Sequence, residues 1–115
     1  MRRVLITFCV CFFTVTCWLK PAGAAQSGMA SYYWQPQKVA CGGRFNPNAM
    51  TAAHKTYKCG TRIRVTNNRN GKSVVVVVND RGPFVRGRIV DVSLAAARQL
   101  GMTNAGVVSV TVTKE

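Results

Sequence analysis

The chain is very poor in acidic residues. Of its 115 residues only three are Asp or Glu and one is His, against 16 Lys or Arg. Carboxylate chemistry is therefore confined to Asp80 and Asp91, because the third acid, Glu115, ends the chain, where residues tend to fray. His54 and the cysteines lack the ligand spacing of a zinc site, so neither a metal nor any other cofactor is expected.

Residues 1–25 have the layout of a secretory signal peptide. Two arginines precede an apolar run from Val4 to Leu19, and small residues end the segment. The run is 16 residues long, shorter than the ~20 that a membrane-spanning helix needs, and its cysteines lack a lipidation context. We expect cleavage after Ala24 or Ala25, a single domain over residues 26–115, and export to the periplasm or out of the cell.

The expected domain is small and contains two cysteines. A chain of about 90 residues buries only a modest core, so a covalent link would help to hold it together. Cys41 and Cys59 are an even pair in an exported domain, a pattern that predicts a disulfide. Closing a loop of about 19 residues would stabilise the fold by roughly 3 kcal/mol in the chain-entropy model.

The basic excess points to a polyanionic partner. Without Arg2, Arg3 and Lys20, 13 of the 16 basic residues remain against three acids, a formal net charge of +10. Nucleic acid is disfavoured because no helix-turn-helix, zinc-finger or RNA-recognition pattern is present. Bacterial wall glycan with its peptide carboxylates, or lipid head groups, fits an exported protein better. Plain solubility is the alternative explanation, and we expect a monomer.

The pattern after residue 26 is mainly that of strands. Alternating or β-branched segments predict strands at 28–34, 61–67, 72–79, 87–92 and 106–114, with a hairpin turn at 68–71. Ser93 is placed to N-cap a helix over residues 94–100, which Gly101 ends. Five or six short strands and one short helix predict a compact, mainly β barrel.

Residues 34–60 differ from the rest of the chain. They are crowded with Gly, Pro and Asn, show no sustained periodicity, and contain both domain cysteines and His54. Long irregular segments in small domains are often functional, so we expect a site here.

Four segments, "GMASYYW", "RFNPNAMTAAHKT", "GTRIRVTN" and "VNDRGPFVRGRIVDVSLAAARQLGM", resemble the rare lipoprotein A family in order and spacing. This resemblance covers essentially all of residues 26–115. It implies a six-stranded double-psi β-barrel, a fold shared with expansins and barwin-like proteins. It also implies a lytic transglycosylase of peptidoglycan that prefers glycan strands stripped of their stem peptides.

A lytic transglycosylase can work with one carboxyl group. The sugar's own 6-hydroxyl attacks the anomeric carbon, so the group that first donates a proton later accepts one. With the resemblance, Asp80 is the expected general acid and base, although an Asp before Arg-Gly-Pro can instead cap a turn. Asp91 is the second candidate, because "VDVS" resembles a substrate-groove segment of expansins. The alternative for Asp91 is support of the helix N-terminus or of a backbone turn.

The resemblance also implies roles for residues around Asp80. We expect His54 to hydrogen-bond Asp80 or the sugar and to tune protonation, the alternative being a half-buried imidazole bonded to backbone. The aromatic side chains Tyr32, Tyr33 and Trp34 are candidates for stacking on sugars, but alternation must send at least one of them into the core. Thr51, Asn79 and Arg81, from the same motifs, complete the expected substrate-binding set.

One position departs from the family pattern. Gly43 stands where the family usually carries Glu in a Gly-Glu-Arg-Phe sequence, in the same segment that contains Cys41. An alternative hypothesis is therefore a non-catalytic, expansin-like or barwin-like module that binds wall glycan.

Overall fold

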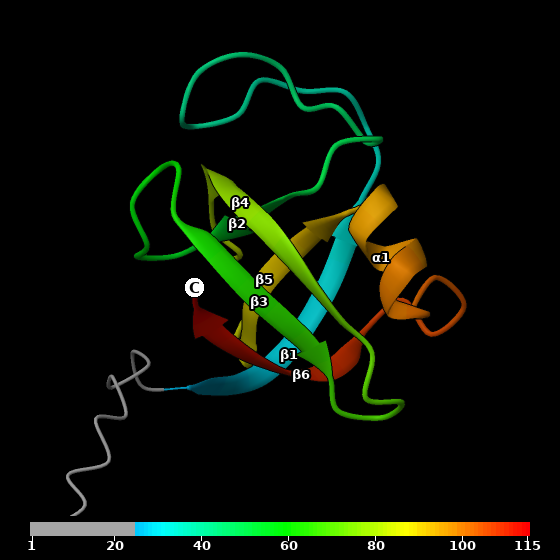
Figure 1. Cartoon of the computed structure of the whole chain (residues 1–115). Helices are drawn as coiled ribbons and strands as arrows, with labels where there is room; N and C mark the ends of the chain where they lie inside the picture. The colour runs from blue at the N-terminus through cyan, green and yellow to red at the C-terminus, as the bar shows by residue number, and fades with distance from the viewer. Residues whose placement is uncertain (1–24) are drawn as a thin grey trace, which may run out of the picture.

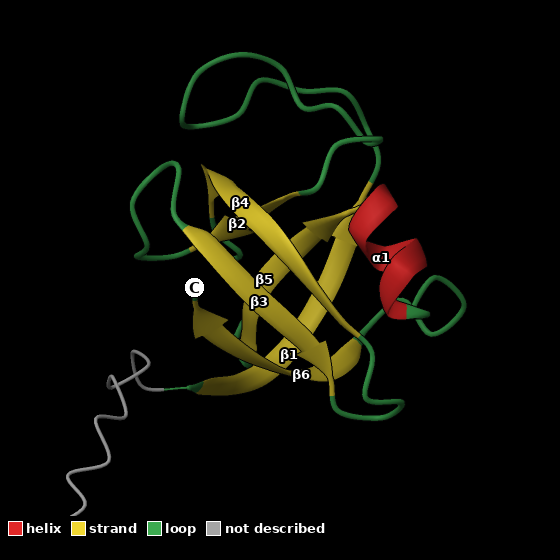
Figure 2. Ribbon diagram, in the orientation of Figure 1, coloured by secondary structure: helices red, strands yellow, loops and turns green. Residues whose placement is uncertain are grey.

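A computed structural model describes residues 25–115. Six strands close into a barrel in the order β1-β5-β2-β4-β3-β6, and one helix packs on its side (Figures 1 and 2). The elements are β1 (Gln26–Tyr33), β2 (Thr51–His54), β3 (Arg62–Asn67), β4 (Ser73–Arg81), β5 (Arg88–Ser93), α1 (Leu94–Leu100) and β6 (Val108–Lys114). The expected six-stranded, mainly β barrel is confirmed.

The expected signal peptide lies outside the described residues, apart from Ala25. Within residues 25–115, no helix combines the length and the apolar character that crossing a membrane requires.

The core comes from strict alternation along the strands. In β4, Val74, Val76 and Val78 are buried, whereas Val75 and Val77 on the other face are only partly covered. Each of β3, β5 and β6 adds further buried aliphatic side chains, and α1 closes the side of the barrel with Leu100. The valine run is therefore one barrel strand with one face in the core.

Local signals set the helix and the hairpin. The Ser93 hydroxyl accepts a hydrogen bond from the Ala96 amide, and Gly101 ends the helix in the left-handed conformation at φ 68°. The turn between β3 and β4 is closed by the Gly71 amide, which donates to the Asn67 carbonyl. Both features agree with the sequence prediction.

Strand β2 was not predicted. It lies inside the segment expected to be irregular, and its four residues are too few to show a period. Ala, which fills two of the four positions, is also depleted in strands. The strand forms because β4 pairs with it in parallel on one side and β5 antiparallel on the other. The same pairing extends β4 to Arg81, two residues beyond the predicted end.

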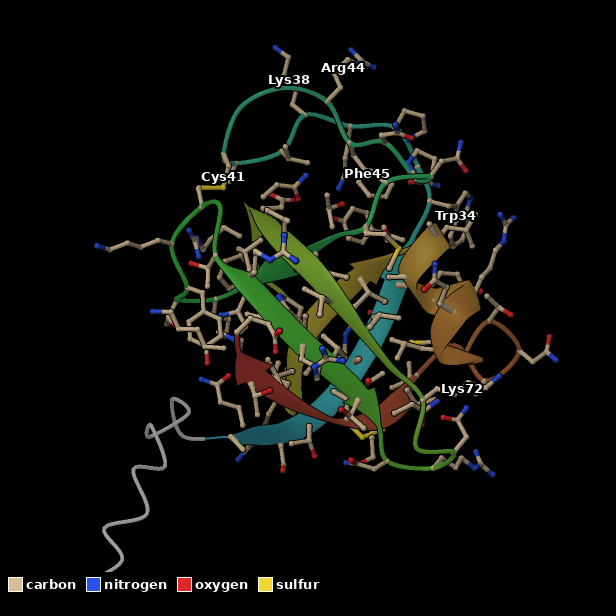
Figure 3. All side chains as sticks on the ribbon, viewed as in Figure 1. Trp34, Lys38, Cys41, Arg44, Phe45 and Lys72 are labelled. Atoms are coloured by element: carbon tan, nitrogen blue, oxygen red, sulfur yellow. A yellow bond between two sulfur atoms is a disulfide. The ribbon has the colours of Figure 1, made fainter. Side chains whose placement is uncertain are left out.

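The segment between β1 and β2 arches over one end of the barrel (Figure 1, top). We call residues 35–50 the arch. Lys38 and Arg44 form a bridge across it and point away from the barrel, while Phe45 is buried (Figure 3). The Cys41–Cys59 disulfide, with a Cα–Cα distance of 5.7 Å, ties the arch to the loop after β2 and confirms the predicted bond.

Candidate active site

The two internal acids share one row of the barrel. Asp91 pairs with Ser31 of β1 and with Ala53 of β2, and Ala53 pairs in turn with Asp80 of β4. We call Ser31, Asp91, Ala53 and Asp80 the acid row. Asp91 stands between two core valines, so its side chain, and with it the row, faces away from the core. Two strand spacings of ~4.8 Å separate the acids, roughly 10 Å across the backbone.

A β-bulge determines which residue joins the row. The pairing of β2 with β4 shifts between Ala52 and Ala53, so that Ala52 lies opposite Val78 but Ala53 lies opposite Asp80. Asn79 is the extra residue of the bulge. Without this shift Asn79 would stand opposite Ala53, because regular pairing advances one residue at a time.

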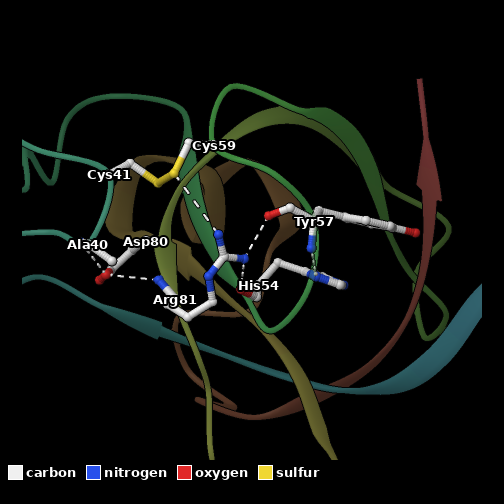
Figure 4. The surroundings of a disulfide bond; sticks show 7 residues. All are labelled: Ala40, Cys41, His54, Tyr57, Cys59, Asp80 and Arg81. Atoms are coloured by element: carbon white, nitrogen blue, oxygen red, sulfur yellow. Dashed lines mark hydrogen bonds between the residues drawn. A yellow bond between two sulfur atoms is a disulfide. The ribbon is translucent and has the colours of Figure 1, made fainter.

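The Asp80 carboxylate is anchored through one oxygen. Its Oδ1 accepts hydrogen bonds from the Ala40 amide at 2.8 Å and from the Arg81 amide at 2.9 Å (Figure 4). The other oxygen, Oδ2, accepts no hydrogen bond from residues 25–115. The Arg81 amide belongs to the next residue along the chain, whereas an Asx-turn uses the amide two residues on. The carboxylate is thus fixed in direction but keeps one oxygen for another partner.

The disulfide lies beside this anchor. The Cys41 amide donates to the Asn79 carbonyl at 3.0 Å, and the Gly60 amide donates to the Val78 carbonyl at 2.8 Å. Both segments that the disulfide joins are therefore bonded to the last residues of β4. Since Ala40 precedes Cys41, the disulfide also fixes the amide that holds Asp80.

The guanidinium group of Arg81 is bonded to backbone carbonyls of the protein. Its Nη1 donates to the carbonyls of His54 at 2.9 Å and of Tyr57 at 2.6 Å (Figure 4). These contacts fix the loop that follows β2. Its expected direct contact with substrate has no support in this geometry.

His54 is buried, with 2% of its surface exposed. Its Nδ1 accepts hydrogen bonds from the amides of Thr56 and Tyr57, and its Nε2 pairs with the Gln26 side-chain oxygen at 2.9 Å. The ring also stacks on Tyr57. Burial lowers the pKa of His54 below its usual 6.5, and the positive charges of Arg81 and Lys55 lower it further. The neutral imidazole thus contacts Gln26 and backbone rather than Asp80.

Asp91 is held by an ion pair. The Arg88 Nη2 atom lies 3.1 Å from Oδ1 and 3.2 Å from Oδ2, and the Ser31 hydroxyl donates to Oδ1. Both side chains of the pair are mostly shielded from solvent. Neither contact involves α1, so the proposed support of the helix N-terminus does not appear.

Tyr33 lies next to the acid row, close enough for the charges of both acids to act on its hydroxyl. It pairs with Ser93, two positions along β1 and β5 from the pair Ser31–Asp91, and therefore shares their face. Its hydroxyl is buried and has no hydrogen-bond partner among the described residues. Burial raises the pKa of Tyr33, and the charges of Asp80 and Asp91 raise it further. The hydroxyl is therefore a neutral donor near two carboxylates.

The other expected substrate-binding residues are two aromatic residues, Tyr32 and Trp34, and two polar ones, Thr51 and Asn79. Tyr32 packs against the core and donates to the Thr103 carbonyl at 2.9 Å, so it is the aromatic residue that alternation sends inward. Trp34 is 56% exposed. Thr51 Oγ1 and Asn79 Oδ1 are buried and, within residues 25–115, have no hydrogen-bond partner. Both oxygens are closed off from solvent, so a ligand would reach them only after neighbouring side chains move.

Gly43 has a backbone that disfavours the family's Glu. Its φ is +86°, in the region that only Gly adopts without strain. A Cβ there would have no atom within 4 Å. A side chain at position 43 would thus be strained and would project into open space.

Sequence reasoning missed three contributors to this site. Ser31 and Arg88 hold Asp91, and only the spacing of three residues between Arg88 and Asp91 hints at the second contact. The Ala40 amide carries no side-chain signal at all. Across the described part of the chain, no group of three His, Cys, Asp or Glu side chains gathers as a metal site would require.

Comparison with known proteins places the chain in a family. A profile of the family described as "Lytic transglycolase" matches residues 25–112. The chain is 57% identical over 88 residues to a Nostoc protein named "Probable endolytic peptidoglycan transglycosylase RlpA". It is 48% identical over 89 residues to the endolytic peptidoglycan transglycosylase RlpA of Pasteurella multocida. These alignments cover 72% and 75% of this chain but only 24% and 30% of the two relatives.

Solved structures show the same fold. A Streptomyces papain inhibitor aligns with a TM-score of 0.67 at 27% identity, over 82% of this chain and 96% of the inhibitor. An expansin of Clavibacter michiganensis aligns with a TM-score of 0.62 at 28% identity, over 79% of this chain and 50% of the expansin. The barrel is thus found in proteins whose names describe different activities.

Proposed function

The chain belongs to the lytic transglycolase family, and on that premise we propose that it is an exported enzyme that cleaves peptidoglycan glycan strands. The expected substrate is a strand stripped of its stem peptides, and the expected product ends in a 1,6-anhydro sugar. The names of the relatives support this activity. We further propose that the protein acts as a monomer in the periplasm or outside the cell.

The placement of Asp80 carries the proposal. Two amides hold Oδ1, so the carboxyl group keeps one orientation. A protonated Oδ2 donates its proton to the glycosidic oxygen as the bond from that oxygen to the anomeric carbon breaks. The 6-hydroxyl of the same sugar then bonds to the anomeric carbon and gives its proton to Asp80. Protons balance without water, and one carboxyl group serves as acid and then as base.

Other side chains on and near the acid row are assigned to positioning the bound sugar. Asp91 lies on the same row, but it is paired with Arg88 and the pair carries no net charge, so we assign it a role in positioning the sugar. Tyr33, Thr51 and Asn79 each present a buried oxygen without a partner among residues 25–115, and we assign them to sugar hydroxyls. Trp34 offers an exposed ring.

His54 and Arg81 act as positioning residues in this proposal. The Arg81 amide holds Asp80, and its guanidinium holds the His54 carbonyl. His54 in turn organises the loop through two amides. Loss of either residue is expected to displace Asp80 rather than to remove a group that contacts the sugar.

The decisive experiment is digestion of peptide-stripped glycan strands followed by mass spectrometry of the products. The protein is expected to release fragments with 1,6-anhydro ends, and Asp80→Asn is expected to release none. Val107→Ala, at an exposed position, serves as the control variant. Absence of anhydro ends with the unaltered protein would sink the proposal.

A non-catalytic wall-binding module is the second candidate, favoured by the strained backbone that a side chain at Gly43 would adopt. It predicts that Asp80→Asn sediments with purified wall sacculi as well as the unaltered protein does, with no anhydro product from either. Loss of sedimentation in that variant would count against a module that binds without Asp80.

A further inference from the structure

The turn between β4 and β5 carries an aromatic side chain that the proposed mechanism does not use. Phe84 is 81% exposed, the highest exposed fraction among the large apolar side chains of residues 25–115. The ring contributes almost nothing to the core. With the adjacent Val85, which is 50% exposed, Phe84 forms a small apolar patch on the surface of this turn.

This turn connects the strands of the two acids. Asp80 lies one residue before the end of β4, and Asp91 lies three residues after the start of β5. Since β2 stands between these strands, the turn passes over the end of β2 and borders the acid row. Phe84 is the fourth residue after Asp80, so their Cα atoms lie at most about 14 Å apart.

The ring is presented on an ordered turn. The Arg88 amide donates to the Val85 carbonyl at 3.0 Å, and the Met29 amide donates to the Gly87 carbonyl at 2.9 Å. Within the turn, the ring lies against Gly82: a Cβ at that position would be 3.5 Å from one ring carbon and 3.7 Å from the next. Gly82 thus leaves room for the ring edge, and the rest of the ring faces solvent.

We propose that Phe84 is a stacking platform for one sugar ring of a glycan that extends from the acid row over the β4–β5 turn. A pyranose has an apolar face of C–H groups that packs on the electron-rich face of an aromatic ring. Its hydroxyl edge suits the donors of Arg86, two residues away in the same turn. The proposal rests on the proposed function only in that the polymer bound at the acid row is a glycan.

The small apolar area of the turn favours a glycan over a membrane. Asp80 and Asp91 border the turn, but Arg81, Arg86 and Arg88 lie beside them and Arg88 is paired with Asp91, so charge does not decide between the two partners. The exposed apolar surface of the turn itself consists of Phe84 and Val85, which is small for insertion into a bilayer.

Binding of purified peptide-stripped glycan strands tests the platform. Phe84→Ala is expected to weaken binding about tenfold, and Phe84→Trp to retain it, because stacking needs a ring. Val107→Ala, at another exposed apolar position, is the matched control and should bind normally. All three variants are expected to keep the unfolding midpoint of the unaltered protein, because neither side chain is buried.

The competing outcomes are separable. Glycan binding by Phe84→Ala that equals that of the unaltered protein would overturn the platform. The platform would also be overturned if Phe84→Ala lost binding to phosphatidylglycerol vesicles but kept binding to glycan. That result would assign the turn to a membrane. Measuring binding in an Asp80→Asn background excludes turnover. If no anhydro ends form but Phe84 still governs glycan binding, the lytic function fails and the platform stands.

Discussion

At the scale of single residues, a substitution of Tyr33 is expected to change activity without lowering stability. Its hydroxyl is buried without a partner among the described residues, while its ring packs on Phe45 at 4.1 Å between centroids. Tyr33→Phe keeps the ring and removes an unpaired polar atom, so stability should stay equal or rise slightly. We expect kcat on glycan strands to fall by about ten- to a hundredfold, because one donor near the reacting charge is lost. An unchanged kcat would refute this role.

His54 makes stability depend on pH in the mildly acidic range. Its pKa in the folded protein is lowered from 6.5, so below that value the unfolded chain takes up a proton before the folded one does. The contribution of His54 is therefore complete above pH ~6.5 and is lost as the pH falls towards the lowered value. Urea unfolding between pH 7.5 and 5 should show this loss in the unaltered protein and a smaller one in His54→Gln. Equal pH slopes in the two proteins would contradict the assignment.

At the scale of elements, the disulfide joins the arch to the loop after β2. Its cysteines are 18 residues apart, and loss of such a closed loop should lower the free energy of unfolding by about 3 kcal/mol. Replacing both cysteines by Ser also frees the Ala40 amide from its fixed place beside Asp80. We therefore expect lower turnover even at temperatures where the variant stays folded. Urea unfolding and product release measured together check this, and a variant with full activity would contradict it.

The elements also show where sequence patterns succeed. Core valines at every second position and the caps at Ser93 and Gly101 act locally, so β4 and α1 were predictable. Strand β2 forms only because β4 and β5 lie on both sides of it, a contact between segments more than 20 residues apart. The bulge that brings Asp80 opposite Ala53 is equally invisible in the sequence. The motif was therefore enough to select Asp80 as a candidate catalytic residue. Its neighbours, such as the Ala40 amide and Ala53, could be found only from the fold.

On the scale of the whole molecule, the barrel combines a basic surface with two internal acids. Residues 26–115 carry 13 Lys and Arg against three acids, yet Asp80 and Asp91 face the same side. The positive field draws the protein towards a polyanion over a distance, whereas the acid row acts on the sugar at contact. Attraction to the wall and cleavage of the glycan therefore depend on different parts of the molecule.

Salt should separate these two contributions. Raising ionic strength from about 0.1 M to 1 M shortens the screening length from roughly 10 Å to 3 Å. Sedimentation with intact sacculi, whose stem peptides carry carboxylates, is expected to fall steeply with added NaCl. Binding to peptide-stripped strands, which keep only the lactyl carboxylate of each muramic acid, should change less, because they carry fewer charges and because stacking and hydrogen bonds to sugar hydroxyls are short-ranged. Equal salt dependence for the two polymers would show that the net positive charge does not direct the protein to the wall.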